Sequence, residues 1–172
     1  MKIVFAFAVA LLLCACDYGV RLNKGDAAPG FAAKRLDGSK LNFPAELKGK
    51  PIAIHFWSQW CTACEPELKD FDTVYRRHKS AGLEVLAINA GERRPAVAAF
   101  AAKLNVSYVI LLDETAAVAR RYGVVGVPTT FFINGEGVVQ SKIVGEADEP
   151  TLEKHAKELL QKSGVTSNAL GL

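Results

Sequence analysis

The segment Trp60-Cys61-Thr62-Ala63-Cys64 constrains this chain more than any other, because it joins an apolar strand to a helix and carries two thiols. A disulfide between Cys61 and Cys64 would close across about one helical turn. The N-terminal amides of the helix would favour a thiolate at Cys61 through hydrogen bonds and the helix dipole. We therefore assign Cys61 as the nucleophile of a thiol-disulfide exchange and Cys64 as the resolving thiol.

The other two cysteines, Cys14 and Cys16, lie at the end of a hydrophobic leader, so only one pair belongs to the folded domain. The leader has one charge, at Lys2, and its apolar run 3–13 is too short to span a bilayer as a helix. The sequence Leu-Cys-Ala-Cys that ends at Cys16 resembles a bacterial lipobox, which implies cleavage before that residue and lipidation of its sulfur. A plain secretory signal and an uncleaved anchor are the alternatives. Asp17 resembles an inner-membrane retention signal, which would place the domain in the periplasm, on the outer face of the inner membrane.

A metal site and a purely structural disulfide are the main alternatives to a redox-active pair. Zinc needs further ligands, and His55, His78 and His155 show no metal-ligand spacing with either thiol, so we expect no metal. A structural disulfide that closed so small a loop would restrict the unfolded chain little. In an oxidising compartment, a pair that acts as a reductase needs a reductant of its own.

Length and composition fit one globular domain with a single good core, because the chain has 172 residues and half of them are apolar. The formal net charge is only +3, with basic residues scattered among acids, which argues against a nucleic-acid partner. We divide the chain into a lipoprotein signal peptide (1–15), a polar tether (16–24), one domain (25–162) and a flexible tail (163–172).

Apolar runs and turn signals predict strands that alternate with helices. Asp37-Gly38 is a strong hairpin turn between two short strands, and Gly135-Glu136-Gly137 joins the last two apolar runs as an antiparallel hairpin. The predicted strands are 31–36, 39–43, 52–57, 83–90, 109–112, 129–134 and 138–144, and the predicted helices run from the CxxC to about 80, over 95–104 and 115–122, and after Pro150. This order predicts an α/β three-layer sandwich with a mixed sheet.

Six motifs between Gly25 and Leu160 occur together in one known family. They are Gly25-Asp26-x-x-Pro29-x-Phe31, Leu36-Asp37-Gly38, Leu47-Lys48-Gly49-Lys50-Pro51, Phe56-Trp57-x-x-Trp60-Cys61-x-x-Cys64-x-x-Glu67, Asn89-Ala90-Gly91-Glu92 and Gly126-Val127-Pro128-Thr129-Thr130-Phe131. With them the chain resembles the TlpA/ResA/CcmG branch of the thioredoxin superfamily, whose members are membrane-tethered thiol-disulfide oxidoreductases. The resemblance implies a thioredoxin-like fold with an N-terminal hairpin and a central insertion at about 89–106.

The resemblance also implies where a substrate binds. It gives Pro128 a cis peptide bond after Val127, placed beside the CxxC, so that the backbone at Val127 pairs with an extended substrate during the mixed disulfide. Trp60, next to the nucleophile, belongs to the same substrate-binding surface. The alternative is a trans proline that merely starts a strand.

Two further residues are candidates for proton transfer. Glu92 falls where the resemblance places an acid near the thiols, and a carboxyl group in an apolar pocket has a raised pKa and can move a proton; a helix-capping acid before Pro95 is the alternative. His55 occupies the strand position where thioredoxins carry a buried acid, with its side chain on the same face as Trp57. We expect it to relay protons to Cys64, or, if charged, to stabilise a thiolate. A satisfied buried histidine is the alternative.

The resemblance implies a monomeric, lipid-anchored protein-disulfide reductase that needs no cofactor. Its electrons would come from a membrane donor of the DsbD/CcdA kind and pass to an oxidised protein, with apocytochrome c as the leading candidate. Thr62-Ala63 departs from the many reducing relatives that have proline before the second cysteine, which leaves the reduction potential open. A peroxiredoxin would need a Thr-x-x-Cys-type loop, and an SCO-like copper module would need CxxxC with a distal histidine.

Overall fold

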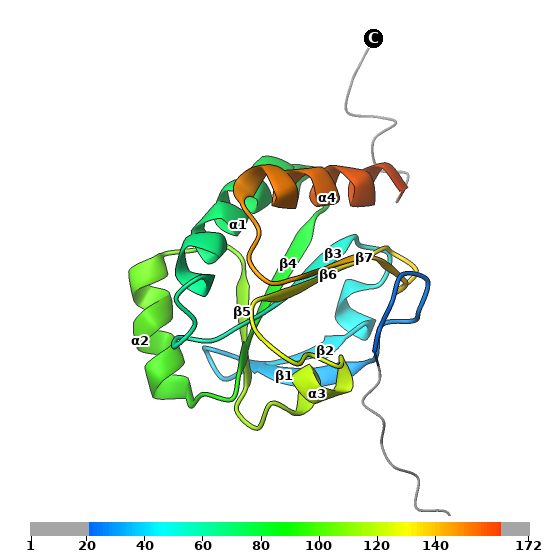
Figure 1. Cartoon of the computed structure of the whole chain (residues 1–172). Helices are drawn as coiled ribbons and strands as arrows, with labels where there is room; N and C mark the ends of the chain where they lie inside the picture. The colour runs from blue at the N-terminus through cyan, green and yellow to red at the C-terminus, as the bar shows by residue number, and fades with distance from the viewer. Residues whose placement is uncertain (1–20, 163–172) are drawn as a thin grey trace, which may run out of the picture.

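A seven-stranded mixed sheet forms the centre of the computed structural model, which describes residues 21–162 (Figure 1). Its order is β2-β1-β5-β4-β3-β6-β7, with β3, β4 and β5 parallel and every other neighbouring pair antiparallel. The strands are β1 (Phe31–Arg35), β2 (Lys40–Phe43), β3 (Ile52–Trp57), β4 (Glu84–Ala90), β5 (Val109–Asp113), β6 (Thr129–Ile133) and β7 (Val139–Val144). The predicted α/β class, the mixed sheet and the N-terminal hairpin are therefore confirmed. The signal peptide, the lipidation site at Cys16 and the tail at 163–172 lie outside the described residues.

Helices cover both faces of this sheet. The helices are α1 (Cys64–His78), α2 (Arg94–Leu104), α3 (Ala117–Arg121) and α4 (Glu149–Lys162), with 3-10 turns at Ala45–Leu47 and Lys79–Ala81. Helices α1 and α4 lie on one face and α3 lies on the other, while α2 lies between β4 and β5 in sequence, where the resemblance implies an insertion (Figure 1). Within residues 21–162, no helix is long and apolar enough to cross a membrane.

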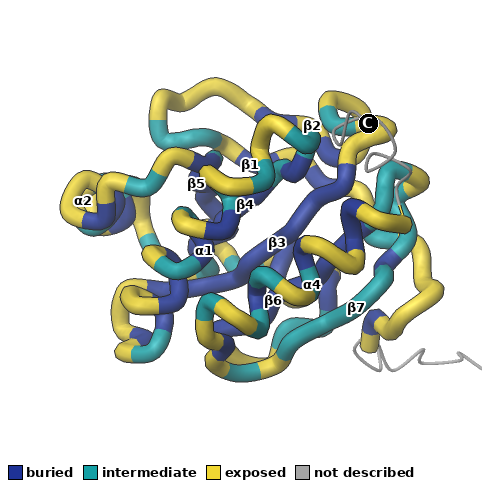
Figure 2. Tube along the Cα trace, turned by 90° about the horizontal axis from the view of Figure 1, so that it is seen from above, coloured by how far each residue is buried: buried dark blue, intermediate teal, exposed yellow. Residues whose placement is uncertain are grey.

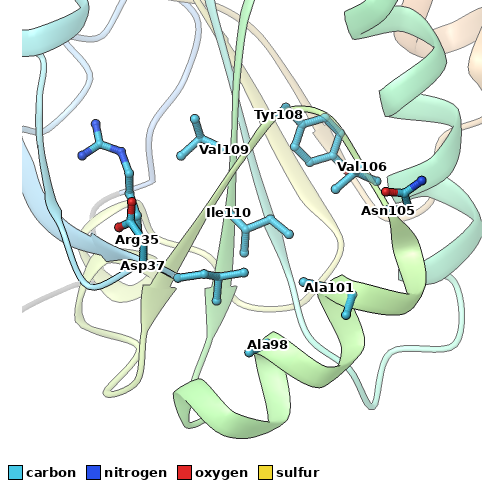
Figure 3. Close-up of a pocket in the computed structure, with 11 residues that line it drawn as sticks. Arg35, Asp37, Ala98, Ala101, Asn105, Val106, Tyr108, Val109 and Ile110 are labelled. Atoms are coloured by element: carbon cyan, nitrogen blue, oxygen red, sulfur yellow. The ribbon is translucent and has the colours of Figure 1, made fainter.

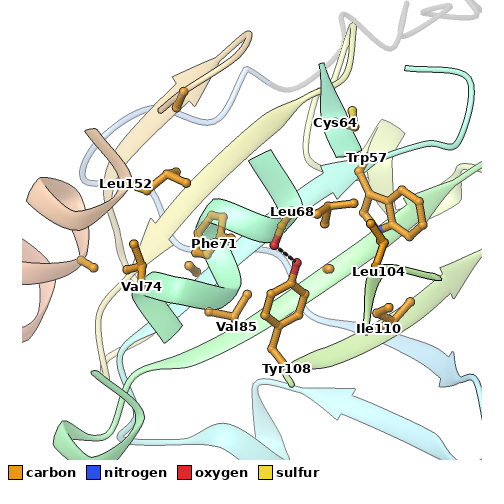
Figure 4. Packing of buried hydrophobic residues seen from close by; sticks show 14 of the residues in the cluster. Trp57, Cys64, Leu68, Phe71, Val74, Val85, Leu104, Tyr108, Ile110 and Leu152 are labelled. Carbon is orange, nitrogen blue, oxygen red and sulfur yellow. Dashed lines mark hydrogen bonds between the residues drawn. The ribbon is translucent and has the colours of Figure 1, made fainter. Parts of the chain in front are cut away.

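Strand β3 is buried along its whole length, because both of its faces are covered (Figure 2). Its side chains alternate between two cores: Ala53 and Trp57 pack under α1, α2 and α4, whereas Ile54 and Phe56 pack on the α3 side. Figure 4 shows the first of these cores, in which Cys64 lies beside the Trp57 ring. The strand thus carries the chain directly from the core to the CxxC.

Several boundaries differ from those predicted. Helix α1 ends at His78 and continues as a 3-10 turn, which Gly82 closes in the left-handed conformation with φ of 93°. Helix α4 begins at Glu149 and not after Pro150, because proline is accommodated in the first turn of a helix, where its missing N–H costs nothing.

The predicted tether ends earlier than expected. Leu22 is buried in the core on the α3 side, and the backbone N–H groups of Gly25 and Ala28 donate to the carbonyl oxygens of Val139 and Gly137. The chain is therefore packed against β7 from Leu22 onward. The free energy gained by burying the apolar side chain of Leu22 outweighs the preference of its polar neighbours for solvent. This attachment lies at the end of the sheet opposite the CxxC.

A surface hollow of about 510 Å³ lies between the turn after β1 and helix α2 (Figure 3). Ala101, Val106, Tyr108 and Ile110 give it a mainly apolar lining, and Asp37 lies at its edge. No residue of the CxxC loop contributes to it.

Candidate active site

Cys61 and Cys64 are joined by a disulfide at the point where β3 passes into α1. The helix begins at Cys64, later than the motif predicts, and residues 61–63 form a turn in which the N–H of Cys64 donates to the carbonyl of Cys61 at 3.1 Å. Cys61 keeps 8% of its surface exposed, whereas Cys64 is completely buried. Only Cys61 is placed to meet a partner, as its assignment as the nucleophile requires.

The loop before β6 reaches the accessible cysteine. The Val127–Pro128 peptide bond is cis, and the carbonyl oxygen of Val127 lies 3.8 Å from Sγ of Cys61. The hydroxyl of Thr129 donates to the carbonyl of Gly126 at 2.7 Å, which fixes the loop locally. The predicted placement of Val127 and Pro128 beside the CxxC is therefore present, with the backbone of Val127 facing the sulfur. The bond between Phe43 and Pro44 is also cis, which the sequence did not indicate.

The two tryptophans of the motif have opposite environments. Trp60 is 71% exposed immediately before the nucleophile, whereas Trp57 is fully buried and stacks on Phe100 of α2 at 5.4 Å between ring centroids. Trp60 is thus available to a partner, and Trp57 links the inserted helix to the strand beneath the disulfide.

Glu92 ties the loop before the CxxC to the end of β4. Its Oε2 accepts hydrogen bonds from the backbone N–H of Gln59 at 2.8 Å and from Nδ2 of Asn89 at 2.6 Å. It does not cap α2, whose N-cap residue Arg93 has no side-chain capping bond. The structure therefore gives Glu92 a positioning contact two residues before Cys61, and its role in proton transfer stays a prediction.

His55 is fully buried, on the same side of the sheet as Trp57, and its ring packs against Phe71 of α1 at 5.6 Å. Its Nδ1 is 2.9 Å from Oγ1 of Thr130, while its Nε2 has no hydrogen-bond partner among the described residues. Burial lowers the pKa of His55 to about 3, so the imidazole is neutral at neutral pH. A charged His55 that stabilises a thiolate is therefore disfavoured, and the side chain is not fully satisfied either.

Glu67 belongs to the CxxC motif quoted above, but the sequence reasoning gave it no role. It lies three residues after Cys64 on the same face of α1, and its side chain is only 1% exposed. Its Oε2 accepts a bond of 3.4 Å from the N–H of Ala147, whereas its Oε1 has no hydrogen-bond partner in the described chain and lies 3.7 Å from Nδ1 of His55. Burial, helped by the nearby charges of Glu146 and Asp70, raises the pKa of Glu67 to about 8.

At neutral pH, His55 and Glu67 therefore form a contact between a neutral imidazole and a protonated acid, because ionising both would leave two desolvated charges. The signal for Glu67 was present in the sequence. Cys64, Glu67, Leu68 and Phe71 have the i, i+3, i+4, i+7 spacing of a buried helical face, so an acid at the second of these positions had to be buried.

No group of three or more potential metal ligands occurs within residues 21–162. The chemistry of the site therefore rests on two sulfurs that exchange a disulfide, one at the surface and one in the core, with a protonated carboxyl group one helical turn from the buried sulfur. Such a fold and site define a thioredoxin-like thiol-disulfide oxidoreductase.

Comparison with known proteins agrees with this class. Residues 24–142 match the AhpC/TSA family, and the chain belongs to it. The thiol-disulfide oxidoreductase ResA of Bacillus subtilis is 32% identical over 166 residues, covering 91% of this chain and 91% of that protein. ResA of Geobacillus kaustophilus is 30% identical, covering 92% of this chain and 96% of that protein. A crystal structure of a thiol:disulfide interchange protein of the thioredoxin family from Chlorobium tepidum superposes with a TM-score of 0.72 at 27% identity, covering 80% of this chain and 98% of that one.

Proposed function

We propose that this thiol-disulfide oxidoreductase works as a protein-disulfide reductase outside the cytoplasm, held by a lipid on Cys16 to the outer face of the inner membrane. The single observation that carries the exchange chemistry is the different exposure of the two sulfurs, and the reducing direction rests on the family resemblance. Cys61 is accessible beside the Val127 carbonyl, and Cys64 is buried directly behind it. A partner can therefore form a mixed disulfide with Cys61 only, and Cys64 is placed to resolve it.

The reaction balances as two successive exchanges. The Cys61 thiolate attacks one sulfur of the substrate disulfide, a bond forms between them, and the other substrate sulfur leaves as a thiolate that takes up a proton. The Cys64 thiolate then attacks Sγ of Cys61, forms the internal disulfide and releases the second substrate thiol. The substrate gains two electrons and two protons, and the same two electrons leave the CxxC dithiol.

Glu67 supports the second exchange. Cys64 is buried, so its thiol proton needs an acceptor within the core, and Glu67 lies one turn further along α1. With a pKa of about 8, the Glu67 carboxyl group is ionised in a minor fraction of molecules at neutral pH, and this ionised form accepts the proton of a thiol, whose ordinary pKa is about 8.5. His55 contacts the unpartnered oxygen of this acid and is placed to orient it.

The family resemblance supports our choice of electron source and substrate. A disulfide has to be reduced again after each turnover, and in an oxidising compartment this requires a dithiol donor, which we take to be a membrane protein of the DsbD/CcdA kind. The substrate is an oxidised protein, and the haem-binding disulfide of an apocytochrome c is our first choice. The lipobox-like sequence at Cys16 supports the location.

A trapping experiment tests this proposal. The variant Cys64→Ala cannot resolve the mixed disulfide, so in cells it should accumulate a covalent complex with its substrate that reducing agent releases. The double variant Cys61→Ala, Cys64→Ala is the matched control and should trap nothing. Adducts that persist in the control, or rapid consumption of peroxide by the wild type without any partner, would argue against a reductase.

The location is tested separately. Mass spectrometry of the protein taken from native membranes should find a chain that begins at an acylated Cys16. An unmodified, soluble N-terminus would remove the lipid anchor from the proposal and leave the exchange chemistry untouched.

A further inference from the structure

Three large apolar side chains are exposed in the described part of the chain. They are Trp60 at 71%, Val125 at 91% and Val144 at 63% exposed. Isolated exposed apolar residues are normal on protein surfaces, but here all the large ones belong to segments that meet at one place.

That place is Cys61. Trp60 precedes it directly, and Val125 lies two residues before Val127, whose carbonyl faces its sulfur. Val144 ends β7, where it pairs with Thr129 at the start of β6, and the N–H of the following residue, Gly145, donates to the carbonyl of Pro128. We call Trp60, Val125 and Val144 the apolar rim.

One side of the rim carries negative charge. Glu146, which is exposed, follows two residues after Val144, and Asp70 lies on α1. The N–H of Ala147, which follows Glu146, donates to Oε2 of Glu67, and Asp70 lies three residues after Glu67 on α1, so both acids lie on the side of the site where α1 meets the loop after β7. Within residues 21–162, neither side chain makes an ion pair or a hydrogen bond, so both charges are free to meet a partner.

We propose that the apolar rim and Glu146 select a particular substrate: an extended peptide segment whose disulfide-bonded cysteine has an apolar neighbour and a basic residue close by. The proposal rests on the reductase function and names the substrate class of that site. The apolar neighbour would be covered by Val125 and Trp60, and the basic side chain would pair with Glu146. A small disulfide such as oxidised glutathione needs none of these contacts, because it presents no apolar side chain to the rim.

Two disulfide-bonded peptides of equal length test the proposal, one with Leu and Lys beside its cysteine and one with Ser and Glu at the same positions. The reduced protein should reduce the Leu/Lys peptide with a kcat/KM about 10-fold above that for the Ser/Glu peptide. The ratio should fall in Val125→Ser and in Glu146→Lys, since the first variant removes the apolar contact and the second reverses the charge that pairs with the basic residue.

Two control variants make the same kinds of substitution at exposed positions away from the CxxC, and they test whether the effect is specific to the rim and Glu146. Ala102→Ser places the same hydroxyl group on an exposed position of α2, and Glu158→Lys makes the same charge reversal on an exposed position of α4, so both should keep the wild-type ratio. A wild-type ratio near one, or a ratio that survives both Val125→Ser and Glu146→Lys, would overturn the proposal. Failure to exchange even with oxidised glutathione would instead refute the reductase function, so the two failures are distinguishable.

Discussion

The end of the sheet beside the disulfide and the aromatic core on the α3 side differ in whether their buried polar groups have hydrogen-bond partners. Beside the disulfide, buried polar side-chain atoms lack hydrogen-bond partners in the described chain, and they belong to His55, Trp57, Ser58, Glu67 and Asn89. The aromatic core is built from rings that contact one another, from Phe31, Phe43, Phe56, Tyr122 and Phe131. Its one phenol is satisfied, because the Tyr122 hydroxyl donates to the carbonyl of Pro29 at 2.8 Å.

This difference indicates that stability and chemistry come from different regions of one domain. An unpartnered buried polar group costs about 1 to 3 kcal/mol, so a cluster of them is a net burden on folding. The burial of apolar surface in the aromatic core offsets this free-energy cost. The active-site end keeps groups whose protonation can change, which is what exchange of a disulfide requires.

The largest expected effect comes from breaking the aromatic core far from the sulfurs. Phe31 is 6% exposed, stacks on Phe43 at 5.2 Å and meets Tyr122 edge-on at 6.0 Å. Phe31→Ala should lower the free energy of unfolding by about 3 to 5 kcal/mol, because it removes burial and leaves a cavity. Denaturant unfolding of the oxidised protein measures this loss.

The same variant should keep its rate of exchange with oxidised glutathione under conditions where it is folded. Suppose instead that Phe31→Ala lost its exchange with oxidised glutathione while its free energy of unfolding changed by less than about 1 kcal/mol. The aromatic core would then serve the chemistry and not the fold, which contradicts the division of roles between the two regions.

The second effect concerns Glu67 and depends on pH. Its pKa is about 8 in the folded protein and about 4.5 when unfolded, so the folded state holds the extra proton between these values and stability falls as pH rises through them. The neutral His55, with a pKa of about 3 when folded and 6.5 when unfolded, makes stability rise with pH up to 6.5. In the window from pH 6.5 to 8 the change is therefore dominated by Glu67, with a loss of about 2 kcal/mol.

Glu67→Gln should flatten this decline, as measured by unfolding of the oxidised protein, in which the thiols do not titrate. Glu65→Gln is the matched control, since Glu65 lies on the same helical turn with about half of its side chain exposed, and it should leave the decline in place. A decline that persists in Glu67→Gln would show that the buried acid is ionised throughout and would remove it from the proton transfer.

Most of the fold was predictable from the sequence, because its signals are local. The nearly continuous apolar run that predicts β3 at residues 52–57, the Asp37-Gly38 turn and the Gly135-Glu136-Gly137 hairpin each depend on neighbouring residues, and the structure has all three. The pairing of β1 with β5 was not predictable in this way, since it joins residues far apart in the sequence, such as Lys34 and Leu112, which are 78 positions apart.

The site was predictable where its chemistry lies within one motif and not where it depends on tertiary contacts. The CxxC and the cis bond before Pro128 follow from motifs, and both are present. The hydrogen bonds of Glu92 to Gln59 and Asn89, and the contact of Glu67 with His55, depend on how α1 and β4 pack against β3. Burial therefore adds Glu67, one helical turn from the buried thiol, to the acid that the sequence reasoning had placed near the thiols at Glu92.

A third, smaller effect tests Glu92 directly. Glu92→Ala should lower the free energy of unfolding by about 1 kcal/mol, because the N–H of Gln59 and the amide of Asn89 lose their acceptor. Glu92→Gln keeps an acceptor oxygen and should be nearly neutral for stability. If the carboxylate also acts on the thiols, Glu92→Gln should lower the pKa of Cys61, since a nearby negative charge disfavours the thiolate. An unchanged thiol titration curve would leave Glu92 with positioning alone.

The smallest effect lies on the outer side of α1, where polar groups are exposed and paired. Arg77 bridges α1 to α4, donating to Glu153 at 2.7 Å and to Glu149 at 3.0 Å, and 47% of its side chain is exposed. Arg77→Ala should lower the free energy of unfolding by less than about 1 kcal/mol, and the difference from wild type should shrink in concentrated salt, because exposed ion pairs are screened.

The same network should also depend on pH through Glu153. Burial alone would raise the pKa of Glu153, but hydrogen bonds from His78, Lys157 and Arg77 lower it to about 2. The contribution of these bonds is therefore complete above pH 4.5 and is lost as pH falls through about 2. Thermal unfolding at pH 7 and pH 2, with and without salt, measures both dependences. A loss above about 2 kcal/mol that salt does not reduce would show that this exposed network stabilises the fold as strongly as a buried one, and the division between a stabilising aromatic core and a reactive polar end would then be incomplete.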